Sequence, residues 1–356
     1  MMEDGKKRIA FIIPRLGKGG AERVISILAS KMAEDGHYIE IYTILSGEVN
    51  YPLSNKVKHI YLDRTDKNKL LQIIKRIVRL RVLIKKAPVD TVISFDRKYG
   101  IAASLFSGKR VIGSERNDPY SNMGKHSVEK YLRDIQYQLA DFIVFQTEYA
   151  KNYFSQGIRK KSAIIANPVE VKAKFDTEWN QNSKEIIAAC RLTPQKNLPM
   201  MIDAFEQFEK NNPGYRLTVF GEGPLKNELE DLLVRKNMQA RVRFAGYSDN
   251  IQEKMRNAVM YISTSDYEGI SNSMLEAMAL GIPVVCTDCP AGGAAMVIQD
   301  GINGYLSPVR NAEQFAKRMQ CVVEQREKTA KIAEKAKEVN SRFSVDEIVK
   351  QWLQIC

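Results

Sequence analysis

Residues 8–45 decide the fold, and their sequence is RIAFIIPRLGKGGAERVISILASKMAEDGHYIEIYTIL. The continuous apolar run at 8–13 predicts a strand that is buried on both faces, as in a parallel sheet. A glycine-rich turn follows at 16–20, and apolar residues then recur at helical spacing as far as Met32. A second apolar run at 38–45 closes the segment, so the sequence predicts a βαβ unit with parallel strands.

The same alternation continues in two successive series. In the first half, further strands are predicted at 58–62, 90–95, 110–114, 142–145 and 162–166. In the second half, strands are predicted at 185–190, 216–220, 241–245, 259–263 and 282–286. The polar stretch 172–184 is predicted to link the two series. A long charged helix is expected at 312–339, followed by an amphipathic helix at 345–355.

Two βα series predict an α/β protein with two doubly wound, Rossmann-like domains facing across a cleft. We expect the first domain to comprise residues 1–168 together with 340–356, and the second to comprise 169–339. Ligands of such sheets bind beyond the carboxyl ends of the strands. Each loop that directly follows a predicted strand is therefore a candidate site.

The charge of the chain is distributed unevenly. Its 356 residues include 54 Lys and Arg and 42 Asp and Glu, which give a net charge of +12. Residues 1–170 carry 30 basic and 18 acidic side chains, and the remainder is neutral. The basic half is therefore expected to meet an anionic partner. A composition with 44% hydrophobic and 27% charged residues excludes collagen-like, disulfide-framework and wholly disordered chains.

The cysteines and the apolar segments indicate a compartment. The chain has five cysteines, and the pair Cys286 and Cys289 lacks a second pair or a nearby His that would complete a metal site. Reduced thiols of a cytoplasmic protein are expected. The apolar run near the N-terminus is too short for a signal peptide, and no stretch approaches the roughly 18 to 20 apolar residues of a membrane span. We expect a cytoplasmic protein, peripheral on the inner face of the membrane.

The strongest functional signal lies at 265–283, with the sequence SDYEGISNSMLEAMALGIP. Ser271 or Asn272 is predicted to cap a helix that ends at Gly281. Glu268 then lies in the loop after a strand, and Glu276 lies about one turn inside the helix. Carboxylates accept hydrogen bonds from hydroxyl groups, and free helix N–H groups donate to phosphate. The segment therefore suits a polyol that carries a diphosphate.

The spacing Glu268-x7-Glu276 within this segment resembles the signature of the retaining family-4 (group 1) glycosyltransferases, which have the GT-B fold. The resemblance is to members that assemble bacterial polysaccharides and lipid-linked glycans. Other segments are similar to family motifs in the expected order: GKGGAER at 17–23, RLTPQKN at 191–197, GEGP at 221–224, DGING at 300–304 and the helix at 343–352. The family also implies that this last helix crosses back to the first domain.

The resemblance implies a role for each matching residue. Arg191 and Lys196 would neutralise the leaving nucleoside diphosphate, Glu268 would hold the donor sugar and Glu276 the ribose hydroxyls. Further donor contacts would come from Gly19, Gly20, Gly221, Gly246, Tyr247, Gly269, Ile270, Ser271 and Asn272. Fixed cations at this place stabilise the charge that the leaving group gathers. The family favours a UDP-sugar as donor, and it leaves open whether Gly292 and Gly293 approach it.

No Asp-x-Asp pair occurs in the sequence, so no carboxylate cradle for a divalent metal is evident. We therefore expect no metal and no cofactor, with Arg191 and Lys196 in place of the metal ion.

The segment SERNDP at 114–119 follows a predicted strand of the first domain. Similar segments lie near the acceptor in related transferases that act on lipid-diphosphate sugars. Many of them have a His near this point, where this chain has Arg116. We assign Arg116 and Lys18 to the acceptor or its phosphate, and a structural pairing of Arg116 with a Glu fits the sequence equally well.

Residues 67–86, KNKLLQIIKRIVRLRVLIKK, contain eight basic residues and no acidic one, with apolar residues at helical spacing. A core-facing helix with a solvated basic face and a helix on a membrane surface both fit this pattern. The second is favoured because the run accounts for most of the positive surplus of its half. An anionic membrane surface is the expected partner.

The expected activity is therefore metal-independent, retaining transfer of a hexose or N-acetylhexosamine from a nucleotide sugar to a polyprenyl-diphosphate-linked glycan. Alternative acceptors are a glycerolipid, a teichoic-type polymer or a soluble saccharide. The isoelectric point near 9.3 also prompts a nucleic-acid-binding protein. That function would require base-contacting motifs that are absent, and it leaves the neutral second half unexplained. We expect no nucleic acid partner.

Overall fold

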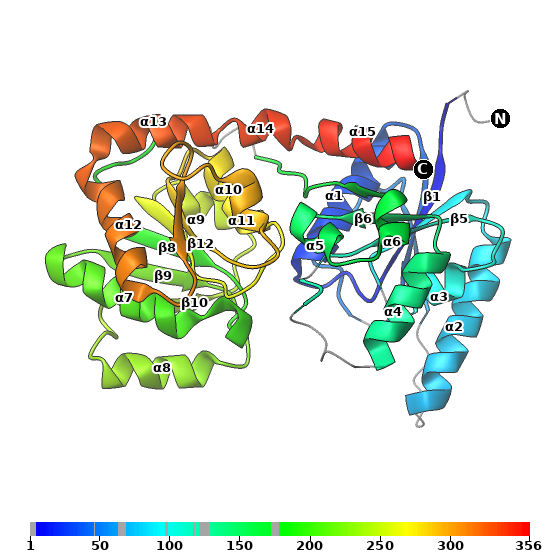
Figure 1. Cartoon of the computed structure of the whole chain (residues 1–356), viewed down its shortest axis with the longest axis horizontal. Helices are drawn as coiled ribbons and strands as arrows, with labels where there is room; N and C mark the ends of the chain where they lie inside the picture. Colours follow the sequence, from blue (N-terminus) through cyan, green and yellow to red (C-terminus); the bar gives the residue numbers. More distant parts are fainter. Residues whose placement is uncertain are drawn as a thin grey trace. The chain divides into compact units, whose positions relative to one another are not determined.

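The computed structural model describes residues 5–45, 47–62, 69–96, 99–116, 118–120, 128–171 and 178–356, without the side chains of 69–71. The chain forms two compact units (Figure 1). Unit 1 comprises Met1–Pro168 and Val345–Cys356, and unit 2 comprises Val169–Ser344.

Unit 1 is built on a parallel seven-stranded sheet with the order β3-β2-β1-β4-β5-β6-β7. Its strands are β1 (Arg8–Ile13), β2 (Tyr38–Thr43), β3 (Lys58–Tyr61), β4 (Thr91–Ser94), β5 (Arg110–Ser114), β6 (Phe142–Phe145) and β7 (Ser162–Ile164). Its helices are α1 (Gly20–Glu34), α2 (Lys69–Lys86), α3 (Gly100–Ser104), α4 (Val128–Leu139), α5 (Glu148–Asn152), α6 (Gln156–Lys160) and α15 (Val345–Ile355). The chain moves outward from β1 in one direction and then from β4 in the other, so the order reverses between these two strands.

Helices cover both faces of this sheet, which explains why β1 is buried along almost its whole length. Because crossovers between parallel strands are right-handed, α1 lies on one face and α2, α3 and α4 lie on the other. On the first face α15 packs on α1, and Lys31 Nζ lies 2.9 Å from Asp346 Oδ1. On the second face Leu80 and Ile84 of α2 are fully buried in a cluster with residues of β1, β2 and β4.

Unit 2 is built on a six-stranded parallel sheet with the order β10-β9-β8-β11-β12-β13. Its strands are β8 (Glu185–Ala189), β9 (Arg216–Phe220), β10 (Val242–Gly246), β11 (Met260–Ser263), β12 (Val284–Asp288) and β13 (Tyr305–Pro308). Its helices are the 3-10 turn η2 (Pro194–Lys196), α7 (Leu198–Asn211), α8 (Lys226–Arg235), α9 (Ile251–Met255), α10 (Asn272–Ala279), α11 (Gly293–Val297), α12 (Ala312–Glu324), α13 (Arg326–Ala336) and α14 (Val339–Arg342).

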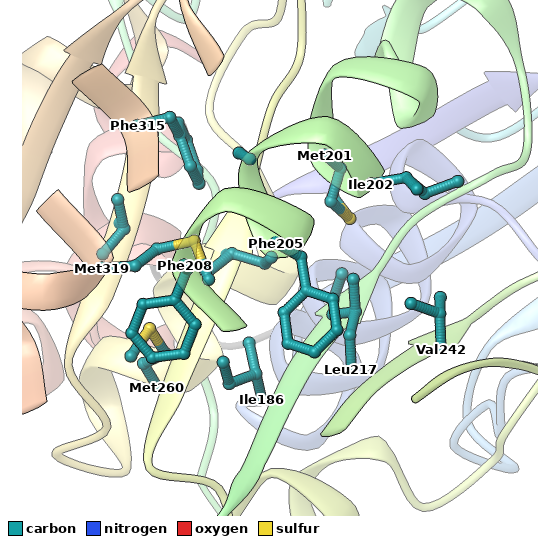
Figure 2. Packing of buried hydrophobic residues seen from close by; sticks show 14 of the residues in the cluster. Ile186, Met201, Ile202, Phe205, Phe208, Leu217, Val242, Met260, Phe315 and Met319 are labelled. Carbon is teal, nitrogen blue, oxygen red and sulfur yellow. The ribbon is translucent and has the colours of Figure 1, made fainter. Parts of the chain in front are cut away.

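The core of unit 2 lies between the sheet and the helices α7 and α12. Figure 2 shows Phe205 and Phe208 of α7 above strand residues that include Ile186, Leu217 and Met260. Phe315 and Met319 of α12 join the same fully buried cluster. These aromatic and branched side chains fill the space between the layers, which fixes the sheet whose loops form the candidate site.

The structure corrects the helix that we predicted at 312–339. Gln325 has the non-helical dihedral angles φ −97° and ψ 54° and separates α12 from α13. Neither a glycine nor a proline causes this interruption. The two helices have different partners, because α12 packs on α7 and α13 packs on α10, and the chain turns a corner between them (Figure 1).

Two further features differ from the expectations. The edge strand β13 was not predicted, because it is short and ends in Pro308, a residue that argues against a strand. The chain re-enters unit 1 after Ser344, whereas we placed this crossing after residue 339. The reason is that α14 stays with unit 2, where Asn340 Nδ2 donates to the carbonyl oxygen of Ala279 (2.8 Å). None of the helices in the described ranges is long and apolar enough to span a bilayer.

Candidate active site

The loops at the carboxyl ends of β8 and β9 lie directly against each other in unit 2. The amide of Cys190 donates to the carbonyl of Phe220 (2.9 Å), and the amide of Gly221 donates to that of Gly246 (2.8 Å). Gly221 has φ +134°, and a Cβ atom there would lie 1.9 Å from the carbonyl oxygen of Cys190. Only glycine fits this position. The glycine pattern that begins at residue 221 therefore reflects a close approach between two loops at the site edge.

Lys196 and Glu268 form an ion pair in which Lys196 is buried and Glu268 is partly exposed. Lys196 ends the turn η2 after β8, and Glu268 lies in the loop after β11, the neighbouring strand. Lys196 Nζ contacts Glu268 Oε1, and Ser265 Oγ donates to Glu268 Oε2 (2.7 Å). Two residues that the family resemblance assigns to the diphosphate and to the sugar are thus in direct contact.

The two loops that carry this pair are tied together by their own hydrogen bonds. Gln195 Nε2 donates to the carbonyl of Tyr267 (2.8 Å), and the amide of Asp266 donates to the carbonyl of Gln195 (2.9 Å). Asn197 Nδ2 also donates to Asp266 Oδ1 (2.8 Å). The pair is therefore held in place before any ligand arrives, as a preorganised electrostatic site requires. No motif in the sequence indicated these tethers.

Arg191 contrasts with Lys196. Its side chain is exposed, and its guanidinium has no hydrogen-bond or ion-pair partner within the described part of the chain. It follows β8 directly, so it lies at the same edge of the sheet as the Lys196–Glu268 pair. One cation at this edge is thus fixed by a carboxylate, and the other is available to a ligand.

Helix α10 carries Glu276 into the interior of unit 2. Ser271 caps the helix, since its Oγ accepts a hydrogen bond from the amide of Met274 (3.4 Å), and Gly281 follows the helix with φ +70°. The capping prediction is thus confirmed, with Ser271 as the cap. Glu276 is buried, and its Oε1 accepts a hydrogen bond from Gln252 Nε2 (2.8 Å). Gln252 was not predicted as a site residue, because it lies on the short helix α9 and belongs to no recognisable motif.

The segment after β12 contacts the backbone of Glu268 and Gly269. The amide of Glu268 donates to the carbonyl of Pro290 (3.1 Å). A Cβ atom at Gly293 would lie 1.9 Å from the carbonyl oxygen of Gly269, so only glycine fits there. Gly293 therefore lies against the backbone of Gly269, which belongs to the segment 265–283.

The cysteines are free thiols in this structure. Burial raises the pKa of Cys190 to about 11 and that of Cys289 to about 12, and it also raises the pKa of Cys286. A protonated thiol is a poor nucleophile and a poor metal ligand. No cluster of three or more His, Cys, Asp or Glu side chains suited to a metal occurs among the residues that the structure describes.

In unit 1 the glycine turn before α1 is covered by an acidic side chain. Gly19 precedes the helix, which begins at Gly20, and a Cβ atom at Gly19 would lie 2.0 Å from Glu22 Oε2. The carboxylate of Glu22 therefore occupies the space beside the turn. Lys18 and Gly20 each have an interaction partner of their own. The assignment of this turn to phosphate stays a prediction.

Arg116 follows β5 and is enclosed by uncharged groups of unit 1. Its guanidinium carbon lies 4.4 Å from the ring centre of Phe95 and 5.8 Å from that of Trp352 on α15. Nη1 donates to Asn167 Oδ1 (3.0 Å), while Nε and Nη2 are shielded from solvent and have no hydrogen-bond partner in the described ranges. Burial lowers the pKa of Arg116 to about 9.

The Arg–Glu pairing that we left open for Arg116 is wrong for the residues described. Glu115 instead accepts a hydrogen bond from Tyr137 (Oη to Oε2, 3.0 Å). Neighbouring residues at the end of a strand point to opposite faces, so Glu115 turns toward α4 and Arg116 turns toward Phe95 and Trp352. Within the described part of the chain, Arg116 is thus a cation without an anionic partner. Asn117 of the same segment lies outside the described residues.

Helix α2 has a side that packs on the core and an exposed side that carries basic residues, as its sequence suggested. Residues 67 and 68 lie outside the described ranges. One side of the helix packs on the core through Leu80 and Ile84. The other side is exposed, and we call it the exposed face of α2; it comprises the apolar residues Ile74, Val78 and Val82 and the basic residues Lys75, Arg79, Lys85 and Lys86.

The two doubly wound units have the GT-B fold, and the family models that match them define the class: an α/β glycosyltransferase. The chain belongs to the group 1 glycosyltransferases. The model of the family described as "Glycosyl transferases group 1" matches residues 170–339, and that of "Glycosyltransferase Family 4" matches residues 18–173. The family and the fold that we expected are thereby confirmed.

Named relatives extend over nearly the whole chain. The chain is 24% identical to the amylovoran biosynthesis glycosyltransferase AmsD of Erwinia amylovora, with 95% of each chain covered. It is 25% identical, with 98% of each covered, to a Campylobacter jejuni α-1,4-N-acetyl-D-galactosaminyltransferase named for an undecaprenol-diphosphate-linked glycan. Among solved structures, HepE of Anabaena in complex with UDP and glucose superposes with a TM-score of 0.83 at 19% identity, with 98% of each chain covered.

Proposed function

We propose that this glycosyltransferase moves a hexose or N-acetylhexosamine from a UDP-sugar, with retention and without a metal, to a polyprenyl-diphosphate-linked glycan at the inner face of the membrane. The observation that carries the proposal is the tethered Lys196–Glu268 pair beside the exposed Arg191. The Campylobacter relative is named for a lipid-diphosphate acceptor, and HepE holds UDP, which supports the choice of acceptor and donor.

The chemistry of the donor site follows from the charges at this edge. Arg191 and Lys196 bind the diphosphate, which gains negative charge as the glycosidic bond breaks, so their fixed positive charges lower the barrier. Glu268 orients the Lys196 ammonium and accepts hydroxyl hydrogen bonds from the donor sugar. The acceptor hydroxyl attacks on the face that the diphosphate leaves, and the departing phosphate takes its proton.

The nucleoside part of the donor binds further along the same edge. Glu276 accepts hydrogen bonds from the ribose hydroxyls, and the backbone at Gly246 and Tyr247 holds the base. The segment from Gly269 to Asn272 and the loop at Gly221 complete the donor contacts. In unit 1 we assign Gly19 and Gly20 to the donor phosphates, and Lys18 with Arg116 to the acceptor phosphate.

Calorimetric titration of UDP, GDP, ADP and dTDP tests the donor assignment. UDP is expected to bind saturably, and the affinity is expected to be the same with EDTA as with Mg²⁺, because side-chain cations replace the metal. Absence of binding by all four diphosphates to the folded protein would contradict the donor site. Binding that requires Mg²⁺ or Mn²⁺ would contradict metal independence.

Co-sedimentation with liposomes that contain anionic lipid tests the membrane assignment. Substitution of Lys75, Arg79, Lys85 and Lys86 by glutamine is expected to weaken binding at least about tenfold, since each basic group near such a surface contributes ~1 kcal/mol. The matched control makes the same change in net charge on unit 2, by substituting glutamine for the exposed residues Lys210, Lys226, Lys254 and Lys317. Equal loss in both variants would indicate a general charge effect and would contradict a specific role for the exposed face of α2.

A further inference from the structure

Two tyrosines at the carboxyl edge of unit 1 expose their rings. Tyr120 is 53% exposed and Tyr149 is 40% exposed. Their ring centres are 5.2 Å apart with an interplanar angle of 55°, and Tyr120 also meets Tyr153 edge-on at 4.4 Å. The amide of Tyr120 donates to Oδ1 of the buried Asp118 (3.0 Å). The pair is thus a fixed aromatic surface and not two independent side chains.

This tyrosine pair and Arg116 lie on the segments that follow two neighbouring strands. Arg116 and Tyr120 follow β5, Gln146 follows β6, and Tyr149 lies in the first turn of α5, which comes next. These strands are parallel neighbours, so both loops leave the sheet at its carboxyl edge. The loops are also joined through Asn167, whose Oδ1 accepts hydrogen bonds from Arg116 Nη1 (3.0 Å) and from Gln146 Nε2 (2.7 Å).

Arg116 lacks the partners that a shielded guanidinium needs. Two of its nitrogen atoms, Nε and Nη2, have no hydrogen-bond partner among the described residues. A cation that is removed from water without a counter-charge destabilises a protein, and such groups are normally paired. Because a guanidinium binds the oxygens of phosphate and carboxylate through several N–H groups at once, an oxyanion is the ligand that best supplies the missing acceptors.

The tyrosine rings complement a different part of a ligand. The flat face of an aromatic ring is apolar and electron-rich, so it packs against the C–H groups on one face of a sugar ring. The phenol hydroxyl at the ring edge can exchange hydrogen bonds with sugar hydroxyls. An exposed pair of such rings, together with a cation that follows the same strand as Tyr120, therefore matches a sugar that carries a phosphate.

We infer that the carboxyl edge of unit 1 is a two-part acceptor site for a glycosyl phosphate, in which Tyr120 and Tyr149 pack on the sugar ring and Arg116 binds the phosphate. This inference rests on the proposed function, and it adds the residues that recognise the acceptor sugar. Phe95 and Trp352 act as positioning residues, because their ring centres lie 4.4 Å and 5.8 Å from the guanidinium carbon.

Saturation-transfer NMR on the full chain with UDP bound tests this inference. The probes are the α-1-phosphates of glucose, galactose, N-acetylglucosamine and N-acetylgalactosamine, together with the methyl α-glycoside of each sugar. At least one 1-phosphate is expected to receive saturation at its ring C–H protons and to bind more tightly than its methyl glycoside. Tyr120→Ala and Tyr149→Ala are each expected to weaken its binding by about 3- to 10-fold.

Two further variants separate the parts of the site. Arg116→Gln is expected to abolish the preference for the 1-phosphate over the methyl glycoside while leaving methyl glycoside binding unchanged. The control Tyr131→Ala removes another exposed tyrosine of unit 1, on α4, and is expected to change nothing. Comparison with the farnesyl diphosphate of the best sugar distinguishes the sources of the ligand: tighter binding identifies a lipid-linked acceptor, and equal binding identifies a soluble one.

The inference is overturned if no 1-phosphate receives saturation in protein that still binds UDP, or if Tyr131→Ala weakens binding as much as Tyr120→Ala. Failure of the unmodified chain to bind UDP would instead overturn the proposed function. Circular dichroism melting of each variant shows that it is folded before its binding is measured. Since both tyrosines are partly exposed, their substitution is expected to leave the fold intact.

Discussion

Replacement of Lys196 by alanine is expected to lower kcat by about 100- to 1,000-fold, the usual effect of removing one preorganised group that stabilises transition-state charge. The effect should fall mainly on kcat, because the charge of the leaving diphosphate grows as the glycosidic bond breaks. Lys196 is suited to this role because its ammonium is already held by Glu268 and its loop is tethered by Gln195. Steady-state rates at saturating donor and acceptor measure the change.

A second variant separates chemistry from folding. Lys196→Ala leaves the carboxylate of Glu268 with Ser265 as its remaining side-chain partner in the described ranges. Because Glu268 is partly exposed, the loss of stability is expected to be smaller than the roughly 3 to 5 kcal/mol that removing one member of a fully buried ion pair typically costs. The double variant Lys196→Met with Glu268→Gln removes both charges at similar volume, so it should recover melting temperature without recovering activity. Lys226→Ala is the control, since this lysine lies on the surface of α8 and 3.8 Å from Glu230. A folded Lys196→Ala enzyme that keeps more than a tenth of its kcat would contradict the assignment.

Much of the fold could be predicted because its signals are local. The strands β1, β5 and β9 coincide with the segments predicted at 8–13, 110–114 and 216–220, and Ser271 caps α10 through a hydrogen bond within its own turn. The interruption at Gln325 could not be predicted, because it depends on which helices α12 and α13 pack against. The strand β13 was missed for a related reason: pairing with β12 outweighs the poor local propensity of a segment that ends in Pro308.

In the candidate site too, single residues could be predicted from local motifs, whereas the contacts between distant residues could not. The family resemblance pointed to Lys196 and Glu268 separately. Their contact could not be predicted, because it joins residues 72 positions apart and depends on β8 and β11 being neighbours in the sheet. Gln252, the hydrogen-bond partner of Glu276, could not be predicted either, because it lies on another helix and belongs to no motif. For Arg116 the sequence left open a pairing with a Glu, and the described structure instead surrounds it with Phe95, Trp352 and Asn167. The tyrosine pair was missed because its rings meet only through the pairing of β5 and β6.

Substitution of Glu276 by glutamine is expected to weaken UDP binding by about 10- to 100-fold, because hydrogen bonds to a charged group contribute roughly 1.5–3 kcal/mol. The change keeps the shape of the side chain, and the glutamine can still accept a hydrogen bond from Gln252, so α10 should remain folded. Calorimetry with UDP measures the loss. Glu327→Gln is the matched control, since it removes the same charge from an exposed position on α13.

Titration with 2′-deoxy-UDP and 3′-deoxy-UDP tests whether Glu276 acts on the ribose itself. The unmodified protein should bind UDP more tightly than at least one of these analogues, and Glu276→Gln should reduce that difference, because the missing hydroxyl and the missing charge affect the same hydrogen bond. The two losses should therefore be non-additive, as expected for groups in contact. If Glu276→Gln weakens UDP and both analogues by the same factor, the carboxylate acts through the packing of α10 against α9, and the ribose hydroxyls must be bound by other groups.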